Sequence, residues 1–385
     1  MYSAISRRIA RSALIALTAA TLAGCSMFSS HNPRYDPAPL TDYPAAISAN
    51  IAWSVSIGSG SGYGFAPALV GDSVYAATPS GSVSKINVAS GAVLWQTSTD
   101  DKLSAGAGSD GNTTAVVAVD GMVIAFDGQG KEKWRSKASS AVSIPPVVGA
   151  GIVAVRSSDY RIQGFDEQTG ELRWSVQRPG PALALKTNMQ MLIVDGMLVS
   201  GLPNGRLVAI DVRSGNVQWE GTISVSQGAT DLERISDVVG APQLQGPLLC
   251  GVSYQGRMVC FDLTQGGRPV WEQYFSSSTG MATDSRQAYS ASQRDIVHAF
   301  ALNDGHEVWK QSDLANRRLS SPAVTPQAVA FGDLEGYVHF LSRTDGQLLG
   351  RVQVGGDAIV SPLVAAPNGV LVQTGSGNLV LVGVN

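Results

Sequence analysis

Short runs of apolar residues alternate with glycines and polar turn residues along most of this chain. Between residues 65 and 98, four such runs follow one another: FAPALV, SVYAATP, GSVSKINV and AVLWQTS. Short runs rich in valine, isoleucine, alanine and aromatic residues, with glycine between them, are typical of β-strands joined by tight turns. The pattern predicts an all-β protein built from units of four strands.

The fourth strand of six predicted units carries the same signature, a glycine followed four residues later by a tryptophan. The signature occurs at Gly91/Trp95, Gly130/Trp134, Gly170/Trp174, Gly215/Trp219, Gly267/Trp271 and Gly305/Trp309. A seventh glycine, Gly346, is followed by Gly350 in place of the tryptophan. From Trp95 to Gly350, successive signatures are 39, 40, 45, 52, 38 and 41 residues apart. A repeat of about 40 residues with several short strands is typical of a β-propeller, in which each repeat forms one blade.

Each residue type of the signature has a physical role. The glycine suits a turn position with positive φ, and a preceding aspartate, as at Asp166, Asp211 and Asp262, can accept backbone amides across the same turn. The tryptophan then opens the outermost strand, where it can pack against the neighbouring blade. A buried indole hides about 150–250 Å², worth roughly 4–6 kcal/mol as an upper bound. We therefore predict that the tryptophans hold the blades together.

The two ends of the chain complement each other. The C-terminal stretch GVLVQTGSGNLVLVGVN supplies strands of a last blade but stops before any glycine–tryptophan hairpin, whereas SANIAWSVSI, around Trp53, supplies an outer strand alone. Pairing the two would remove two exposed sheet edges. We predict an eight-bladed propeller over residues 49–385, closed by the N-terminal strand.

Residues 1–24 have the features of a bacterial lipoprotein signal peptide. Three arginines, at positions 7, 8 and 11, precede the apolar stretch ALIALTAATLAG, which is too short to span a bilayer. Leu22-Ala23-Gly24-Cys25 resembles a lipobox, which implies that Cys25 is lipidated; an ordinary signal peptide with an incidental cysteine is the alternative. Ser26, in place of aspartate, indicates sorting to the outer membrane of a Gram-negative bacterium, facing the periplasm. Residues 25–48 are polar and proline-rich, so we expect a flexible tether.

The charge of the chain excludes some partners. All three basic residues of the first 24 are arginines and none of the 30 acidic residues lies there, so the remaining chain carries 24 basic residues and a formal charge of −6. Scattered charge of this kind gives no basic surface for nucleic acid or for anionic lipid.

Cys250 and Cys260 lie on the two arms of a predicted hairpin, directly opposite each other. An oxidising periplasm would permit a disulfide between them. Bridges between directly paired strand positions are often strained, however, so we favour two buried reduced thiols.

No motif indicates catalysis or a bound cofactor or metal. The four histidines show no ligand spacing and there is no Cys-x-x-Cys. The stretch from Gly106 to Gly111 fits G-x-G-x-x-G, but it lies between propeller strands rather than in a strand–helix unit.

The hairpin consensus D-x-x-[ST]-G-x-x-x-W resembles the repeat of the quinoprotein (PQQ-type) propellers, a fold shared by dehydrogenases and by non-catalytic proteins. The dehydrogenases typically carry a vicinal disulfide in the cofactor pocket, and this chain has no Cys-Cys pair. A PQQ-dependent dehydrogenase is therefore the second hypothesis.

Three further stretches, TDLERISDVVGAP, KQSDLANRRLSSPAV and GDLEGYVHFL, together with the lipobox and tether, resemble the BamB family of outer-membrane protein assembly factors. The resemblance covers nearly the whole chain. It implies a non-catalytic lipoprotein without a cofactor, which binds the periplasmic domains of the barrel-inserting subunit BamA within the β-barrel assembly machinery. A direct chaperone, whose exposed blade edges pair with unfolded outer-membrane proteins, is a further alternative.

The longest repeat, 52 residues, points independently to a binding loop. About ten surplus residues fall in VSQGATDLERISDVVG, which forms either one helical turn or an extended loop. The family resemblance implies partner contacts at Leu183, Leu185, Lys186 and Asp237, and we add Arg234 to this candidate site. Two positions depart from the family pattern, since Lys186 replaces an arginine and Val239 replaces an aspartate. Alternatively, Leu183 and Leu185 belong to an inner strand with alternate residues buried.

Overall fold

The computed structural model describes residues 33–181 and 183–384. The predicted signal peptide, Cys25 and the first part of the predicted tether lie outside these residues. The described residues from 38 onwards form one compact unit, and the preceding described residues contain a short 3₁₀ helix, η1 (Pro33–Tyr35). Within the described part of the chain, no helix is long and apolar enough to cross a membrane.

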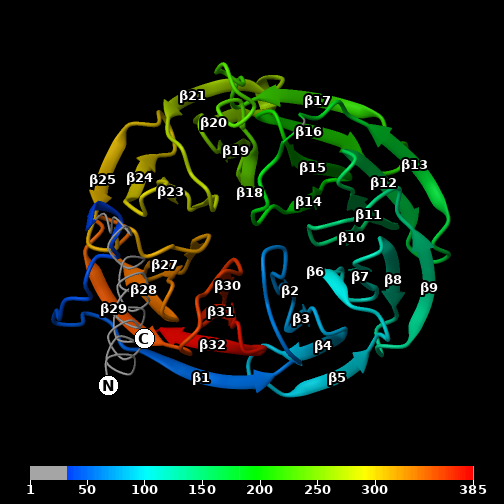
Figure 1. Ribbon diagram of the computed structural model, residues 1–385, viewed down its shortest axis with the longest axis horizontal. Helices are drawn as coiled ribbons and strands as arrows, with labels where there is room; N and C mark the ends of the chain where they lie inside the picture. The colour runs from blue at the N-terminus through cyan, green and yellow to red at the C-terminus, as the bar shows by residue number, and fades with distance from the viewer. Residues whose placement is uncertain (1–32, 182, 385) are drawn as a thin grey trace, which may run out of the picture. The chain divides into compact units, whose positions relative to one another are not determined.

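Eight four-stranded antiparallel sheets are arranged as the blades of a ring (Figure 1). The strands, from the innermost outwards, are, in blade 1, β2 (Ala68–Val70), β3 (Ser73–Ala77), β4 (Ser82–Asn87) and β5 (Val93–Ser98); in blade 2, β6 (Leu103–Ser109), β7 (Thr114–Ala118), β8 (Met122–Phe126) and β9 (Glu132–Lys137); in blade 3, β10 (Val147–Gly149), β11 (Ile152–Arg156), β12 (Arg161–Asp166) and β13 (Leu172–Gln177); in blade 4, β14 (Met191–Val194), β15 (Met197–Leu202), β16 (Arg206–Asp211) and β17 (Val217–Thr222). They continue, in blade 5, with β18 (Val238–Gln245), β19 (Leu248–Ser253), β20 (Arg257–Asp262) and β21 (Arg268–Tyr274); in blade 6, with β22 (Met281–Thr283), β23 (Gln287–Ala291), β24 (Val297–Ala301) and β25 (Glu307–Gln311); in blade 7, with β26 (Ala323–Val324), β27 (Val329–Gly332), β28 (Tyr337–Leu341) and β29 (Leu348–Gln353); and in blade 8, with β30 (Val364–Ala366), β31 (Gly369–Gln373), β32 (Asn378–Val384) and β1 (Ala49–Ser56). A second 3₁₀ helix, η2 (Leu263–Gln265), joins β20 to β21. The predicted eight-bladed propeller is confirmed.

The N-terminal strand closes the ring, as predicted. β1 pairs antiparallel with β32 from Ala49 opposite Val384 to Ser56 opposite Asn378, so the last blade takes its outer strand from the other end of the chain. Because neighbouring strands run antiparallel, the connections alternate between two faces of the ring. We call the face with the connections between blades the mouth face; it also carries the turns between the second and third strands. The opposite, hairpin face carries the glycine–tryptophan turns.

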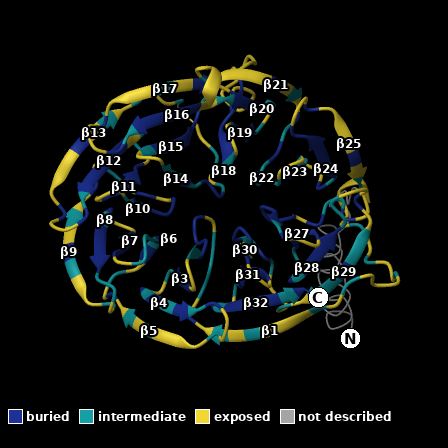
Figure 2. Ribbon diagram, turned by 180° about the vertical axis from the view of Figure 1, so that it is seen from behind, coloured by how far each residue is buried: buried dark blue, intermediate teal, exposed yellow. Residues whose placement is uncertain are grey.

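The core lies between the blades. The second strands, such as β3, β7 and β11, are buried throughout, whereas the outer strands alternate between covered and exposed residues (Figure 2). Six of the seven tryptophans donate an indole N–H to a backbone carbonyl oxygen of the next blade, at distances of 2.9 Å (Trp53–Val88), 3.1 Å (Trp95–Gly128), 2.9 Å (Trp134–Glu167), 2.6 Å (Trp174–Val212), 2.7 Å (Trp271–Leu302) and 3.0 Å (Trp309–Arg343).

The glycine of each signature forms its own turn and also makes room for the tryptophan of the preceding blade. Gly91 and Gly130 adopt φ of 71° and 79°, and a Cβ on either would lie 2.8 Å from the indole of the preceding blade, Trp53 or Trp95. Two features of the structure thus require a glycine at this position: the positive φ of the turn, and the close approach of the tryptophan, which leaves no space for a Cβ. The repeated signature therefore encodes contacts between blades.

The missing tryptophan at Gly350 has a structural reason. A Cβ there would lie 3.1 Å from the Ile47 side chain and 3.2 Å from the Ile47 carbonyl oxygen. The amides of Ala46 and Ile47 donate to the carbonyl oxygen of Leu349, at 2.8 and 3.2 Å. The segment that leads into β1 occupies the place where an indole would lie.

Part of the predicted tether is bound to the propeller, so that expectation is wrong for residues 38–47, which we call the N-terminal strap. The amide of Ala38 donates to the carbonyl oxygen of Ala315 at 2.8 Å, and the guanidinium of Arg351 donates to the carbonyl oxygen of Thr41 at 2.8 Å. Arg351 also lies over the ring of Tyr43, 5.5 Å from its centre. These polar and aromatic contacts hold a segment that has no apolar periodicity, and only the fold brings their partners together.

Cys250 and Cys260 form a disulfide, so the preference for two reduced thiols is wrong. The two residues are directly paired in the β19–β20 ladder, with Cα atoms 4.1 Å apart, and both are fully buried. The register of this hairpin brings the sulfur atoms into bonding range.

Candidate partner-binding site

The candidate site is built on residues 183–189, the mouth segment, which leads from β13 into β14 on the mouth face. Asn188 is its central residue: its side-chain oxygen accepts the amide of Gly64 at 2.9 Å, and its side-chain nitrogen donates to the carbonyl oxygen of Val360 at 2.6 Å. The hydroxyl of Thr187 donates to the carbonyl oxygen of Ser278 at 2.6 Å. Gly64, Ser278 and Val360 precede blades 1, 6 and 8, so the mouth segment is fastened to blades across the ring.

The structure brings Leu185 and Asp237 into direct contact. The amide of Leu185 donates to a carboxylate oxygen of Asp237 at 2.6 Å, which joins the mouth segment to the insertion before blade 5. The side chain of Leu185 is partly buried against the core between blades 5 and 6, and Val239 lies within that same core. The position where the family pattern has a second aspartate therefore carries a core residue here.

Asp237 cannot meet a partner directly, because its exposed fraction is 0%. Burial raises the pKa of Asp237, against the opposing effect of the Leu185 and Asn204 amides and of the Arg156 charge. Arg156 is itself buried; its guanidinium donates to the carbonyl oxygen of Gly201, and burial lowers its pKa to about 10. Our expectation that the charge of Asp237 faces the partner is thus corrected, since the carboxylate positions the mouth segment from beneath.

Leu183, Lys186 and Arg234 are exposed. Leu183 has an exposed fraction of 44%, and β14 begins only at Met191, so the alternative that Leu183 and Leu185 lie in an inner strand is wrong. On the insertion, Leu232 has an exposed fraction of 68%. Three residues of the predicted site and one further leucine are therefore accessible on the two segments that the Leu185–Asp237 hydrogen bond joins.

The insertion before blade 5 forms a single turn, one of the two conformations we expected. The carboxylate of Glu233 accepts the amides of Ala229 and Thr230 at 2.8 and 3.1 Å, and the Thr230 hydroxyl accepts the amide of Glu233 at 3.3 Å. This reciprocal pattern follows the Thr-x-x-Glu spacing, which is a capping signature. Arg234 donates through Nε to the carbonyl oxygen of Gly228 at 3.0 Å, and its side chain is exposed.

Two cavities border the mouth segment. One, of about 250 Å³, lies towards blade 3 and is lined by Arg156, Tyr160 and Leu185 among others. The second, of about 310 Å³, lies towards blade 6 and is lined by Lys186 and Arg318 among others. No sequence pattern indicated Arg156, Asn188 or Arg318, because each acts through a neighbour that is distant along the chain. Within the described residues, no group of three or more histidine, cysteine, aspartate or glutamate side chains is arranged to hold a metal ion.

Comparisons with known proteins agree with this architecture. Residues 79–311 match the model of the family described as outer membrane protein assembly factor BamB. The BamB of Bordetella pertussis is 58% identical over 97% of this chain and 97% of its own length. The chain belongs to the BamB family.

Comparison with solved structures shows which proteins share this fold. The crystal structure of BamB from Moraxella catarrhalis superposes with a TM-score of 0.81, at 24% identity, over 87% of this chain and all of that one. A europium-containing methanol dehydrogenase superposes with a TM-score of 0.64, at 15% identity, over 84% of each chain. The propeller is therefore shared with quinoprotein enzymes as distant fold relatives, and the sequence similarity lies with the assembly factors.

Proposed function

We propose that this protein is a non-catalytic binding module of the outer-membrane β-barrel assembly machinery, anchored in the outer membrane through a lipid on Cys25, and that it binds the periplasmic domains of BamA. Family membership supports the role in outer-membrane protein assembly. The observation that carries the binding proposal is the mouth segment, which presents Leu183 and Lys186 on a support fixed to several blades.

The proposed surface combines apolar anchors with charges. Leu183 and Leu232 supply exposed apolar area, the exposed cations Lys186 and Arg234 lie on the same two loops, and the Leu185–Asp237 hydrogen bond joins these loops. A prearranged surface loses little conformational freedom on binding, which favours affinity. A few such anchors usually carry most of the binding energy of an interface.

A pull-down with the purified periplasmic domains of BamA tests the proposal. Leu183→Glu is expected to weaken binding by at least about tenfold, because it places a charge in an apolar contact. Leu263→Glu is the matched control: Leu263 has an exposed fraction of 42%, close to the 44% of Leu183, but lies on the hairpin face. If both variants bind the BamA domains as tightly as the unchanged protein does, the mouth face is not part of the interface.

The enzyme alternative has its own test. Incubating the protein with PQQ and calcium, followed by spectroscopy and a dye-linked oxidation assay, should give neither a bound chromophore nor turnover. A stoichiometric chromophore with substrate-dependent dye reduction would replace the binding proposal with a dehydrogenase.

A further inference from the structure

The larger cavity of the mouth face is lined by more cationic than anionic groups. It has a volume of about 310 Å³ and lies between the mouth segment and the connection from blade 6 to blade 7. Its charged lining residues are Lys186, Arg318 and Asp295. Two cations therefore share the cavity with one carboxylate, in a chain whose overall charge is negative.

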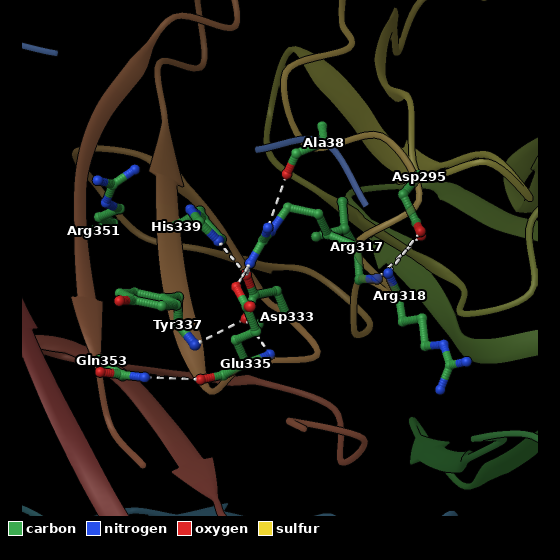
Figure 3. A network of polar contacts seen from close by, with 12 residues as sticks. Ala38, Asp295, Arg317, Arg318, Asp333, Glu335, Tyr337, His339, Arg351 and Gln353 are labelled. Carbon is green, nitrogen blue, oxygen red and sulfur yellow. Dashed lines mark hydrogen bonds and ion pairs between the residues drawn. The ribbon is translucent and has the colours of Figure 1, made fainter. Parts of the chain in front are cut away.

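Arg317 and Arg318 are neighbours in sequence with opposite roles. The guanidinium of Arg317 is buried and donates to Asp333, to Glu335 and to the carbonyl oxygen of Ala38 (Figure 3). The side chain of Arg318 is exposed and points away from this network. Within the described residues, neither the guanidinium of Arg318 nor the ammonium of Lys186 has a hydrogen-bond or ion-pair partner. Both cations are thus free to bind a ligand.

The backbone holds Arg318 in an unfavourable conformation. Its φ is 52°, a left-handed value that side chains other than glycine rarely adopt. Asp295 maintains it: one carboxylate oxygen accepts the amide of Arg318 at 2.7 Å, and the other accepts the amide of Leu319 at 3.0 Å. Strain of this kind persists where surrounding contacts impose it, and it is concentrated at functional sites.

We propose that this cavity binds an acidic side chain of the protein partner that covers the mouth face, with the carboxylate held between Arg318 and Lys186. This inference rests on the proposed function. A guanidinium fork and an ammonium offer donors only, which suits a carboxylate. The cavity shares Leu185 and Lys186 with the proposed surface, and its size suits a side chain. A phosphate on an anionic membrane is the less favoured source, because the negative chain as a whole is repelled by such a surface.

Binding of the purified periplasmic domains of BamA to the mature chain tests this assignment. Lys186→Gln with Arg318→Gln is expected to weaken binding about 10–100-fold at 50 mM salt, and to reduce the dependence of affinity on salt. The control, Lys131→Gln with Arg213→Gln, removes the same two charges from exposed turns of the hairpin face and should bind like the unchanged protein.

Carbodiimide cross-linking identifies the ligand group, because it joins an ammonium only to a carboxylate in contact with it. Mass spectrometry should find Lys186 linked to an aspartate or glutamate of the partner, and less so after Arg318→Gln. Binding within twofold of the unchanged protein by the double variant, while Leu183→Glu has lost it, would overturn the carboxylate site and leave the proposed function intact. If the unchanged protein fails to bind the BamA domains at all, both proposals fail. Loss of binding to phosphatidylglycerol vesicles alone, with partner binding retained, would assign the cavity to a lipid phosphate instead.

Discussion

Replacing Arg317 with leucine is expected to lower the free energy of unfolding by about 3–5 kcal/mol, because the change leaves a buried carboxylate without its cation. Arg317 and Asp333 have side-chain exposed fractions of 3% and 0%, and their closest atoms are 2.7 Å apart. His339, also buried, donates from Nε2 to the same carboxylate at 2.9 Å (Figure 3).

The pKa values of the network agree with an ionised Asp333 beside a neutral histidine. Burial pushes the pKa of Asp333 up, but hydrogen bonds from His339, from the Tyr337 amide and from Arg317 outweigh it and hold the pKa below its ordinary value. Burial lowers the pKa of His339, although Asp333 opposes the shift. The guanidinium therefore supplies the one full positive charge that compensates Asp333 inside the network, which is why its removal is costly.

Equilibrium urea unfolding of the mature chain, with Cys25 replaced by alanine for solubility, measures the effect. Adding Asp333→Asn to Arg317→Leu keeps an acceptor for the backbone amides but removes the stranded charge, so it should recover about 1–3 kcal/mol. Arg317→Leu should also expose the N-terminal strap to proteases, since the hydrogen bond to Ala38 is lost. A cost below about 1 kcal/mol, or no recovery in the double variant, would refute the reasoning.

Four further outcomes are expected. Gly305→Ala should lower the free energy of unfolding by about 1–3 kcal/mol more than Gly196→Ala does. The two glycines have similar φ, 76° and 74°, but only a Cβ at Gly305 would meet an indole, that of Trp271, at 2.5 Å. Equal losses of stability in thermal melts would show that the packing of the indole on the glycine is not the cause. Because the pKa of His339 is lowered in the folded protein, the unfolded chain binds a proton on this histidine first as the pH falls, so the free energy of unfolding should decrease below about pH 6.5. His339→Gln should make the free energy of unfolding less dependent on pH in this range. An unchanged pH dependence would contradict this role of His339. Deleting strand β1 should leave β32 as an exposed edge and cause aggregation, and an unchanged melting curve would show that ring closure is dispensable. Cys25→Ala should release a folded protein from the membrane fraction, whereas sedimentation with the membranes at high salt would disprove the lipid anchor.

The sequence alone predicts the fold because the repeat is local. A glycine and a tryptophan four residues apart recur once in most blades, and strand patterning within each blade spans fewer than 40 residues. Counting the seven signatures, with Gly346/Gly350 among them, and the outer strand at Trp53 gives eight blades. Ring closure was also predictable, since the first and last segments each lack the strands that the other supplies. Of the candidate site, the exposed positions Leu183 and Lys186 follow from the family resemblance, and Arg234 follows from its place in the surplus residues of the longest repeat.

Tertiary structure decided what depends on contacts between distant segments. The sequence could not indicate that Asp237 lies buried beneath Leu185, nor that Asn188 fastens the mouth segment to blades 1 and 8, because these partners are 52 to 172 residues apart. The N-terminal strap has a composition typical of a tether, yet it is bound by Arg317 and Arg351, some 280–310 residues later in the chain. Local patterns encode strands and turns through backbone preferences and alternate burial, whereas the ionisation and burial of a polar side chain depend on which groups the closed ring brings beside it.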